Sequence, residues 1–251
     1  MTTTTMATQM RTILHTAAAA ALLLMAATGC APKEKSDKAV EREQWLASLN
    51  DSIATYKKQI DSTQQRLDAL NEESARLLER FDYIENPREV EGYYLLKGWQ
   101  GRHPANATWL YARISKSEGL ELLASLKGGV FTSVAALSGG ESAETAAVAP
   151  DQALNFRHKG YNTVCFYGAE ADSVAAFIAA HEGDDVTIEY LNPGRSGSLK
   201  LSADQRAMIA ETWRLYDTRR QIRRLEKEMP MLSRRIDACR LMMERDSTTS
   251  K

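Results

Sequence analysis

Few side chains in this sequence are of the types that carry out chemistry, and their spacing forms no catalytic motif. The histidines after residue 30 are His103, His158 and His181, and no pair of them has the spacing of metal ligands. Cys165 alternates within an expected strand and has no predicted base beside it, so a nucleophilic thiol is not expected. The sequence therefore predicts no catalytic residue, no metal and no cofactor.

Three short polar stretches match known site motifs only in part. SGGES (138–142) has paired glycines but lacks the lysine and the spacing of a phosphate loop. GRSGS (194–198) does not complete the nucleophile-elbow pattern. Asp184 and Asp185 are adjacent in sequence, and their neighbours indicate a hairpin turn rather than a calcium loop. These stretches favour a protein that is not an enzyme.

Aromatic side chains are the best candidates for a binding surface. Alternation in an expected strand at 107–115 places Trp109 and Tyr111 on one face and aliphatic residues on the other. The aliphatic face suits a core. The aromatic face suits either stacking against a ligand such as a sugar ring, or a second packed layer under a helix. The candidate binding residues are Tyr93, Trp99, Trp109, Tyr111 and Arg113.

The candidates lie in a turn-rich module at 87–201. Apart from Gly29, every glycine lies between Gly92 and Gly197. Short runs rich in aromatic and β-branched residues predict strands, and residues 170–181 predict one short helix. The predicted strands are 89–97, 107–115, 119–126, 129–137, 142–148, 161–167, 185–191 and 197–201. We expect an antiparallel β-sandwich or a partly open barrel that carries this helix.

Two glycine-free segments flank the module, and both have the pattern of coiled-coil helices. Apolar residues recur at alternating steps of three and four, which predicts helices at 41–85 and 203–246, with Pro87 ending the first. The first seam is Leu46, Leu49, Ile53, Tyr56, Ile60, Thr63, Leu67, Leu70, Ser74, Leu77, Phe81 and Ile84. The second seam is Met208, Glu211, Leu215, Thr218, Ile222, Leu225, Met229, Leu232, Ile236, Cys239 and Met243.

The two seams have similar lengths, which favours an antiparallel pair within one chain. The first helix is net acidic and the second net basic, and this charge difference favours pairing between them. The fold class is then α+β, with a two-helix stalk and an inserted β-domain. Parallel dimerisation of two chains is the competing arrangement. Pro230 predicts either a tolerated kink or a hinge. Cys165 and Cys239 would lie at opposite ends of the stalk, so no disulfide between them is expected.

The N-terminus has the order of a secretory signal. Residues 1–29 contain one charge, Arg11, then an apolar run and small residues, and Cys30 follows. This order resembles the lipobox of bacterial lipoproteins, in which the cysteine is lipidated and becomes the mature N-terminus. Ala27 stands where leucine is commonest in that pattern. The resemblance implies a lipid anchor at Cys30 and a flexible tether over 30–40, and an ordinary cleaved signal is the alternative.

The residue after Cys30 bears on location. In the resembling lipoproteins, aspartate after the cysteine often marks retention in the inner membrane, and Ala31 stands there instead. We therefore expect an outer-membrane lipoprotein of the bacterial envelope that faces the periplasm, with a disordered tail at 247–251. Without Arg11 of the expected signal, 31 basic and 33 acidic residues give a net charge near −2, which argues against nucleic acid as a partner. The expected function is non-catalytic presentation of the β-domain to an envelope protein. The alternative is carbohydrate binding through exposed aromatic residues, by a monomer or a coiled-coil dimer.

Overall fold

The structure is a computed structural model that describes residues 37–85, 91–102, 107–151 and 154–249. The expected signal, Cys30 and most of the tether lie outside these residues. The chain divides into two units between Leu46 and Ala47, and the contacts described below all lie within the second unit. The elements are α1 (Asp37–Leu78), β1 (Phe81–Ile84), β2 (Tyr93–Leu96), β3 (Trp109–Ser115), β4 (Leu120–Lys127), β5 (Ser133–Ser138), β6 (Glu141–Glu144), β7 (Asn155–His158), β8 (Tyr161–Phe166), α2 (Ala169–Ala180), β9 (Thr187–Asn192), β10 (Gly194–Lys200) and α3 (Ala203–Thr249).

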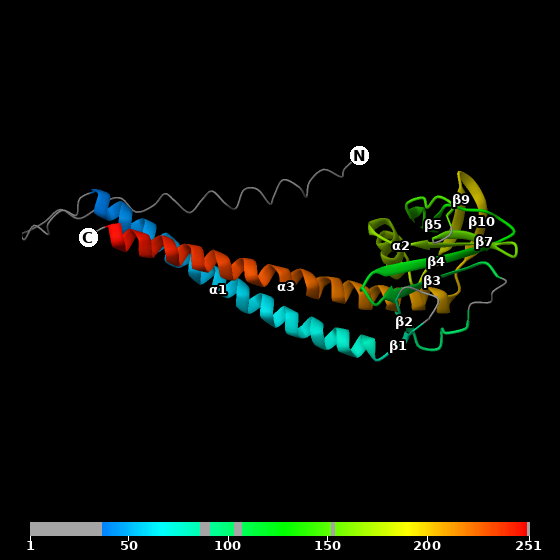
Figure 1. Cartoon of the computed structure of the whole chain (residues 1–251), viewed down its shortest axis with the longest axis horizontal. Coiled ribbons are helices and arrows are strands. Elements are labelled where there is room, and N and C mark those ends of the chain that lie inside the picture. Colours follow the sequence, from blue (N-terminus) through cyan, green and yellow to red (C-terminus); the bar gives the residue numbers. More distant parts are fainter. Residues whose placement is uncertain (1–36, 86–90, 103–106, 152–153, 250–251) are drawn as a thin grey trace, which may run out of the picture. The chain divides into compact units, whose positions relative to one another are not determined.

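The strands form two antiparallel sheets, as the sequence predicts. The larger sheet has six strands in the order β1-β2-β3-β4-β8-β7, and the smaller has four in the order β10-β9-β5-β6. Most neighbours in the larger sheet are hairpin partners, while β5 pairs with both β6 and the distant β9. The long helices precede and follow this β-rich region (Figure 1). The α+β fold class is confirmed.

A common core joins the two sheets. Tyr190 of β9 is fully buried, and its hydroxyl donates a hydrogen bond to the carbonyl oxygen of Trp109 in β3, 3.0 Å away. The ring of Phe131 lies edge-on to Tyr190 at 4.9 Å between centroids and 6.3 Å from the ring of Phe166 in β8. Helix α2 adds Val174 and Ile178, both fully buried. Burial of these large side chains supplies most of the domain's stability.

The first half of α3 belongs to this core, and the second half does not. Met208, Ile209 and Leu215 are fully buried, because α3 packs against β3, β2 and α2. From residue 224 onward the buried side chains are Leu225, Leu232 and Ile236, all on the predicted seam. In the same way, every predicted seam residue of α1 from Leu49 to Leu77 is buried or half-buried, while nearly all residues between them are exposed.

Contacts between α1 and α3 occur at two separate levels. Arg66 donates a hydrogen bond to Oε1 of Gln221 at 3.0 Å. Further along, the guanidinium of Arg235 lies 5.7 Å from the ring centroid of Tyr56. From the first contact to the second, the residue number falls from 66 to 56 in α1 and rises from 221 to 235 in α3. Residue numbers run in opposite directions in this way between antiparallel helices.

The predicted end of the first helix is wrong. Helix α1 ends at Leu78 rather than at residue 85, and residues 81–84 form β1, which pairs with β2 in the register Phe81↔Leu96. The segment FDYI is rich in aromatic and β-branched residues, and Phe81 is 6% exposed in the core of the β-domain. Phe81 and Ile84 therefore belong to a strand and not to a seam. Pro87 lies outside the described residues.

Other boundaries also differ. Strand β7 was not predicted, because NFRH has no apolar alternation; it is a short edge strand that pairs with β8. The segment predicted as a strand at 142–148 pairs only as far as Glu144. Helix α1 begins at Asp37, inside the predicted tether, and α3 extends to Thr249, inside the predicted tail. Helix α3 continues through Pro230.

Candidate functional site

The predicted aromatic face exists, and it is a packed surface. Trp109 and Tyr111 lie 5.0 Å apart between ring centroids on β3. Tyr111 is only 8% exposed, while Trp109, Tyr93 and Trp99 are partly buried against the core. Sugar stacking on both Trp109 and Tyr111 requires that both rings face solvent, and Tyr111 does not meet this requirement.

Arg113 is engaged within this face. Its Nε donates to Oε2 of Glu121 on β4 at 2.5 Å, and its guanidinium lies 4.1 Å from the ring centroid of Tyr93. Only 8% of the residue is exposed. A buried arginine whose charge is paired in this way stabilises the pairing of β2, β3 and β4. It offers little charge to an incoming ligand.

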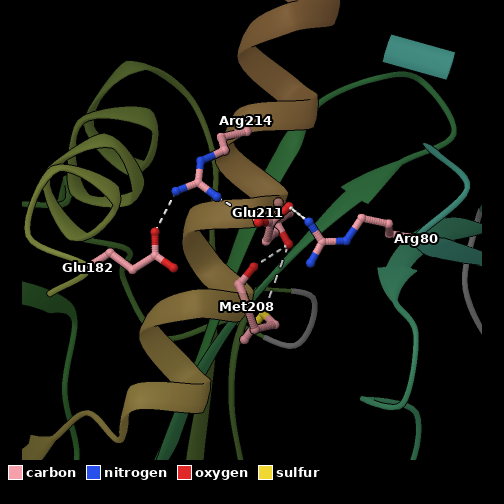
Figure 2. A network of polar contacts seen from close by, with 6 residues as sticks. Arg80, Glu182, Met208, Glu211 and Arg214 are labelled. Carbon is pink, nitrogen blue, oxygen red and sulfur yellow. Dashed lines mark hydrogen bonds and ion pairs between the residues drawn. The ribbon is translucent and has the colours of Figure 1, made fainter. Parts of the chain in front are cut away.

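The polar groups that the structure brings together lie instead around α3, where the long helices meet the β-domain. Figure 2 shows Glu211 of α3 between two arginines. One carboxylate oxygen accepts a hydrogen bond from Arg80, which follows α1, at 2.6 Å, and the other accepts one from Arg214 at 2.6 Å. Arg214 also pairs with Glu182, just beyond α2. One chain of charges thus connects α1, α3 and α2.

The Glu211 carboxylate has a structural rather than a catalytic environment. Its side chain is 10% exposed, and each oxygen already has a charged donor. A mostly buried carboxylate with an arginine on each oxygen serves to hold the elements that carry those arginines together. Sequence analysis placed Glu211 at a seam position, and its partner Arg80 is 131 positions away in the chain, so no local pattern could have linked them.

A second cluster holds α2 on α3. The Tyr216 hydroxyl donates to Oδ2 of Asp172 at 2.8 Å, and Arg220 lies 3.6 Å from the same oxygen. Burial raises the pKa of Asp172 above its ordinary value, and the hydrogen bond from Tyr216 and the charge of Arg220 offset part of this rise. Burial and the hydrogen bond to Asp172 raise the pKa of Tyr216 to about 12. Tyr216 is therefore a permanent donor at neutral pH.

The tip of the β3–β4 hairpin is also attached to α3. Glu118 has a left-handed backbone with φ of 66°, which disfavours residues other than glycine. Its carboxylate pairs with Arg223 and lies 3.9 Å from Arg219. The first half of α3 is thus the element to which α1, α2 and this hairpin are all anchored.

A buried pair of amides joins the sheets, and sequence analysis missed it. Asn162 is fully buried; its Oδ1 accepts from the Phe131 amide at 2.8 Å, and its Nδ2 donates to Oδ1 of Asn155 at 2.7 Å. Asn155 in turn donates to the carbonyl of Val148 at 2.7 Å. Each amide is satisfied, so the pair specifies how the sheets meet. Alternation of Asn162 with Val164 and Phe166, which are also buried, was the signal available in the sequence.

One polar cleft in the described region has about 390 Å³ and is lined by Ser138, Gly139, Glu141, His181, Asp184 and Asp185. His181 ends α2, where its Nδ1 lies 2.9 Å from the carbonyl oxygen of Phe177. Within the residues that the structure describes, no group of His, Cys, Asp or Glu is arranged to hold a metal ion. A groove of about 350 Å³ is lined mainly by alanine and other apolar side chains.

The remaining sequence candidates lie apart. His158 is exposed on β7, and His103 lies outside the described residues. Cys165 and Cys239 form no disulfide in the structure. Cys30, the predicted lipidation site, is outside the described residues.

Comparison with known proteins identifies no relative of this chain. The chain matches no protein-family model, no curated protein and no solved structure. No helix in the described part of the chain is long and apolar enough to cross a membrane.

Proposed function

We propose that this protein is a non-catalytic lipoprotein of the bacterial envelope that presents its β-domain on a helical stalk for contact with a protein partner. The observation that carries the proposal is the pattern of exposure along α1 and α3. Outside the β-domain both helices cover only one narrow stripe of side chains and expose the rest to water. Long helices with so narrow a covered stripe are suited to connecting a domain to its attachment point and holding it at a distance.

We propose further that the stalk is an antiparallel coiled coil within one chain. The stripe on each helix repeats at steps of three and four residues, the spacing of a coiled-coil seam. The contacts of Arg66 with Gln221 and of Arg235 with Tyr56 support the antiparallel direction.

Membrane attachment rests on the lipobox resemblance at Cys30. Labelling cells with an alkyne-tagged fatty acid tests it directly. The wild-type chain should carry the label and fractionate with outer membranes, and Cys30→Ser should remove the label. A labelled Cys30→Ser chain, or an unlabelled wild type, would contradict the attachment.

Partner binding by the β-domain calls for a test that leaves the fold intact. Deleting the β-domain would expose the buried half of α3, so we favour a photo-crosslinking amino acid at single exposed positions in cells. Phe156 and Tyr167 are 44% and 60% exposed on the β-domain, and Lys58 is an exposed control on α1. We expect a discrete crosslinked protein from the β-domain positions and not from Lys58. The reverse pattern would show that the stalk carries the binding surface.

Glycan binding by Trp109 and Tyr111 is not proposed, because Tyr111 is buried.

A further inference from the structure

The outward face of α3 carries a stripe of basic and apolar side chains that the proposed function does not use. On a helix of 3.6 residues per turn, these residues fall in a sector of about 120° between residues 220 and 245. The sector lies roughly opposite the seam of Leu225, Leu232 and Ile236. We call this set the outer stripe. It consists of Arg220, Arg223, Arg224, Lys227, Met231, Arg234, Ala238, Leu241, Met242 and Arg245. Arg235 marks one edge of the sector, where its guanidinium lies over the ring of Tyr56 of α1.

Acidic side chains are absent from the outer stripe, although this part of α3 contains several. Glu226, Glu228, Asp237, Glu244 and Asp246 all fall on the flanks of the helix, outside the sector. A solvated helix face with no further role ordinarily mixes both signs of charge. Segregation of the acids to the flanks leaves the outer stripe with a uniformly positive potential.

Within the described residues, three basic side chains of the stripe face water without a charged partner. Arg224, Lys227 and Arg234 are exposed and make no ion pair there. Arg220 and Arg223, at the end near the β-domain, are paired with Asp172 and Glu118. The available positive charge therefore lies along the half of α3 that extends beyond the β-domain.

Large apolar side chains interrupt the charges on the same face. Met231, Leu241 and Met242 are 55%, 48% and 49% exposed. On a helix that only needed to remain soluble, these positions would be polar. Arginine and lysine mixed with exposed methionine and leucine on one face is the pattern of a helix that lies on a bilayer surface, where cations meet phosphates and apolar side chains enter the headgroup boundary.

We infer that the outer stripe of α3 binds the surface of an anionic phospholipid bilayer. Charge complementarity carries this choice, since arginine matches phosphate in geometry as well as in charge. From Arg224 to Arg245 the stripe is about 32 Å long, so α3 would lie along the bilayer. The inference does not depend on lipidation of Cys30, and the test omits that modification, so either can fail alone.

Vesicle flotation tests the inference. The full chain with Cys30→Ser is mixed with vesicles of phosphatidylcholine alone or with about one-third phosphatidylglycerol. The readout is the ratio of the two partition coefficients, in which the contribution of the apolar leader, common to all variants, cancels. We expect a ratio well above one, which R224Q/K227Q/R234Q lowers at least about tenfold.

The matched control removes the same amount of charge from the other helix. Lys57, Lys58 and Arg76 are exposed on α1, and K57Q/K58Q/R76Q should leave the ratio within about twofold of the parent. Equal loss in both triple variants, or no preference for anionic vesicles, would overturn the inference. Self-association in sedimentation velocity that only the α3 variant abolishes, without vesicle preference, would assign the stripe to a second copy and also overturn it.

Discussion

At the scale of single residues, Asn162 determines how the two sheets meet. Its fully buried amide satisfies both the Phe131 amide and the Asn155 side chain. We expect Asn162→Ala to lower the free energy of unfolding by about 1–3 kcal/mol, because it leaves buried polar groups without partners. Urea unfolding followed by circular dichroism measures the change.

Arg157 provides the control for this substitution, since it lies directly across from Asn162 on β7 but is exposed. Arg157→Ala should change the free energy of unfolding by less than about 0.5 kcal/mol. A loss of the same size in both variants would show that the strand pair, and not the buried amide, is sensitive.

In the β7–β8 turn, substitutions at two neighbouring positions should change the free energy of unfolding in opposite directions. Lys159 and Gly160 have φ of 50° and 84°, as a two-residue hairpin turn requires. Lys159→Asn should raise the free energy of unfolding by up to about 1 kcal/mol, because asparagine tolerates the left-handed region better than lysine. Gly160→Ala should lower it by about 1–2 kcal/mol. Two changes of the same sign in thermal or urea unfolding would contradict this assignment of the turn.

The buried carboxyl group of Asp172 should make the stability of the folded chain depend on pH. Its pKa is raised in the folded state, so the folded chain binds this proton more tightly than the unfolded chain does. The stabilising contribution of the protonated form is complete below about pH 3.8, the ordinary pKa, and is lost as the pH rises through the raised value. Above that value the cost of burying the charge is constant.

Asp172→Asn removes this proton equilibrium and keeps an acceptor for Tyr216. The difference in free energy of unfolding, wild type minus variant, should therefore fall as the pH rises from about 4 and then level off. Urea titrations at several pH values measure this difference. A difference that grows with pH would mean that the ion pair with Arg220 outweighs burial.

At the scale of elements, Glu118 at the tip of the β3–β4 hairpin has both a strained backbone and ion pairs with α3. Glu118→Gln keeps the left-handed backbone and loses the pairs with Arg223 and Arg219, so it should destabilise by less than about 1 kcal/mol at this half-exposed site. Glu118→Gly loses the same pairs but relieves about 1 kcal/mol of strain, so it should be the more stable of the two. Thermal unfolding ranks them, and a glycine variant less stable than the glutamine variant would contradict the strain.

The elements that sequence analysis predicted well are those specified by local periodicity. Outside the β-domain, the heptad steps identified which residues of α1 and α3 are covered, because a repeat of 3.5 residues is a property of the helix itself. The predicted end of α1 was wrong because burial of the Phe81 side chain beside Leu95 of β2 contributes more free energy than one further helical turn would. Strand β7 is formed by the β7–β8 turn and by its pairing with β8. Neither feature produces a hydrophobic pattern in the sequence.

The candidate site was less predictable than the fold, for a related reason. Alternation correctly placed Trp109, Tyr111 and Arg113 on one face, but alternation cannot say what covers that face. The Glu211 cluster joins side chains from three elements that are far apart in sequence. Charges of this kind are scattered through the chain, and only the packed structure selects which of them meet.

At the scale of the whole molecule, the proposed stalk requires that α1 and α3 of the same chain contact each other. Arg66 and Gln221 contact each other, whereas Arg66 and Arg235 belong to different levels, about 21 Å apart along α3. In a background with Cys30→Ser, Cys165→Ser and Cys239→Ser, R66C/Q221C treated with a short bismaleimide should crosslink within one chain. Faster migration under denaturing electrophoresis at unchanged mass detects the internal link.

The pair R66C/R235C serves as the control and should remain uncrosslinked, because its two thiols would lie beyond the reach of a short reagent. Products of twice the chain mass from R66C/Q221C would instead support dimerisation between chains. Light scattering of the untreated protein separates these arrangements independently, since an intrachain stalk leaves a monomer. The seams are the stripes that the long helices cover. The chain that covers each seam therefore decides whether a pair of long helices carries one β-domain or joins two.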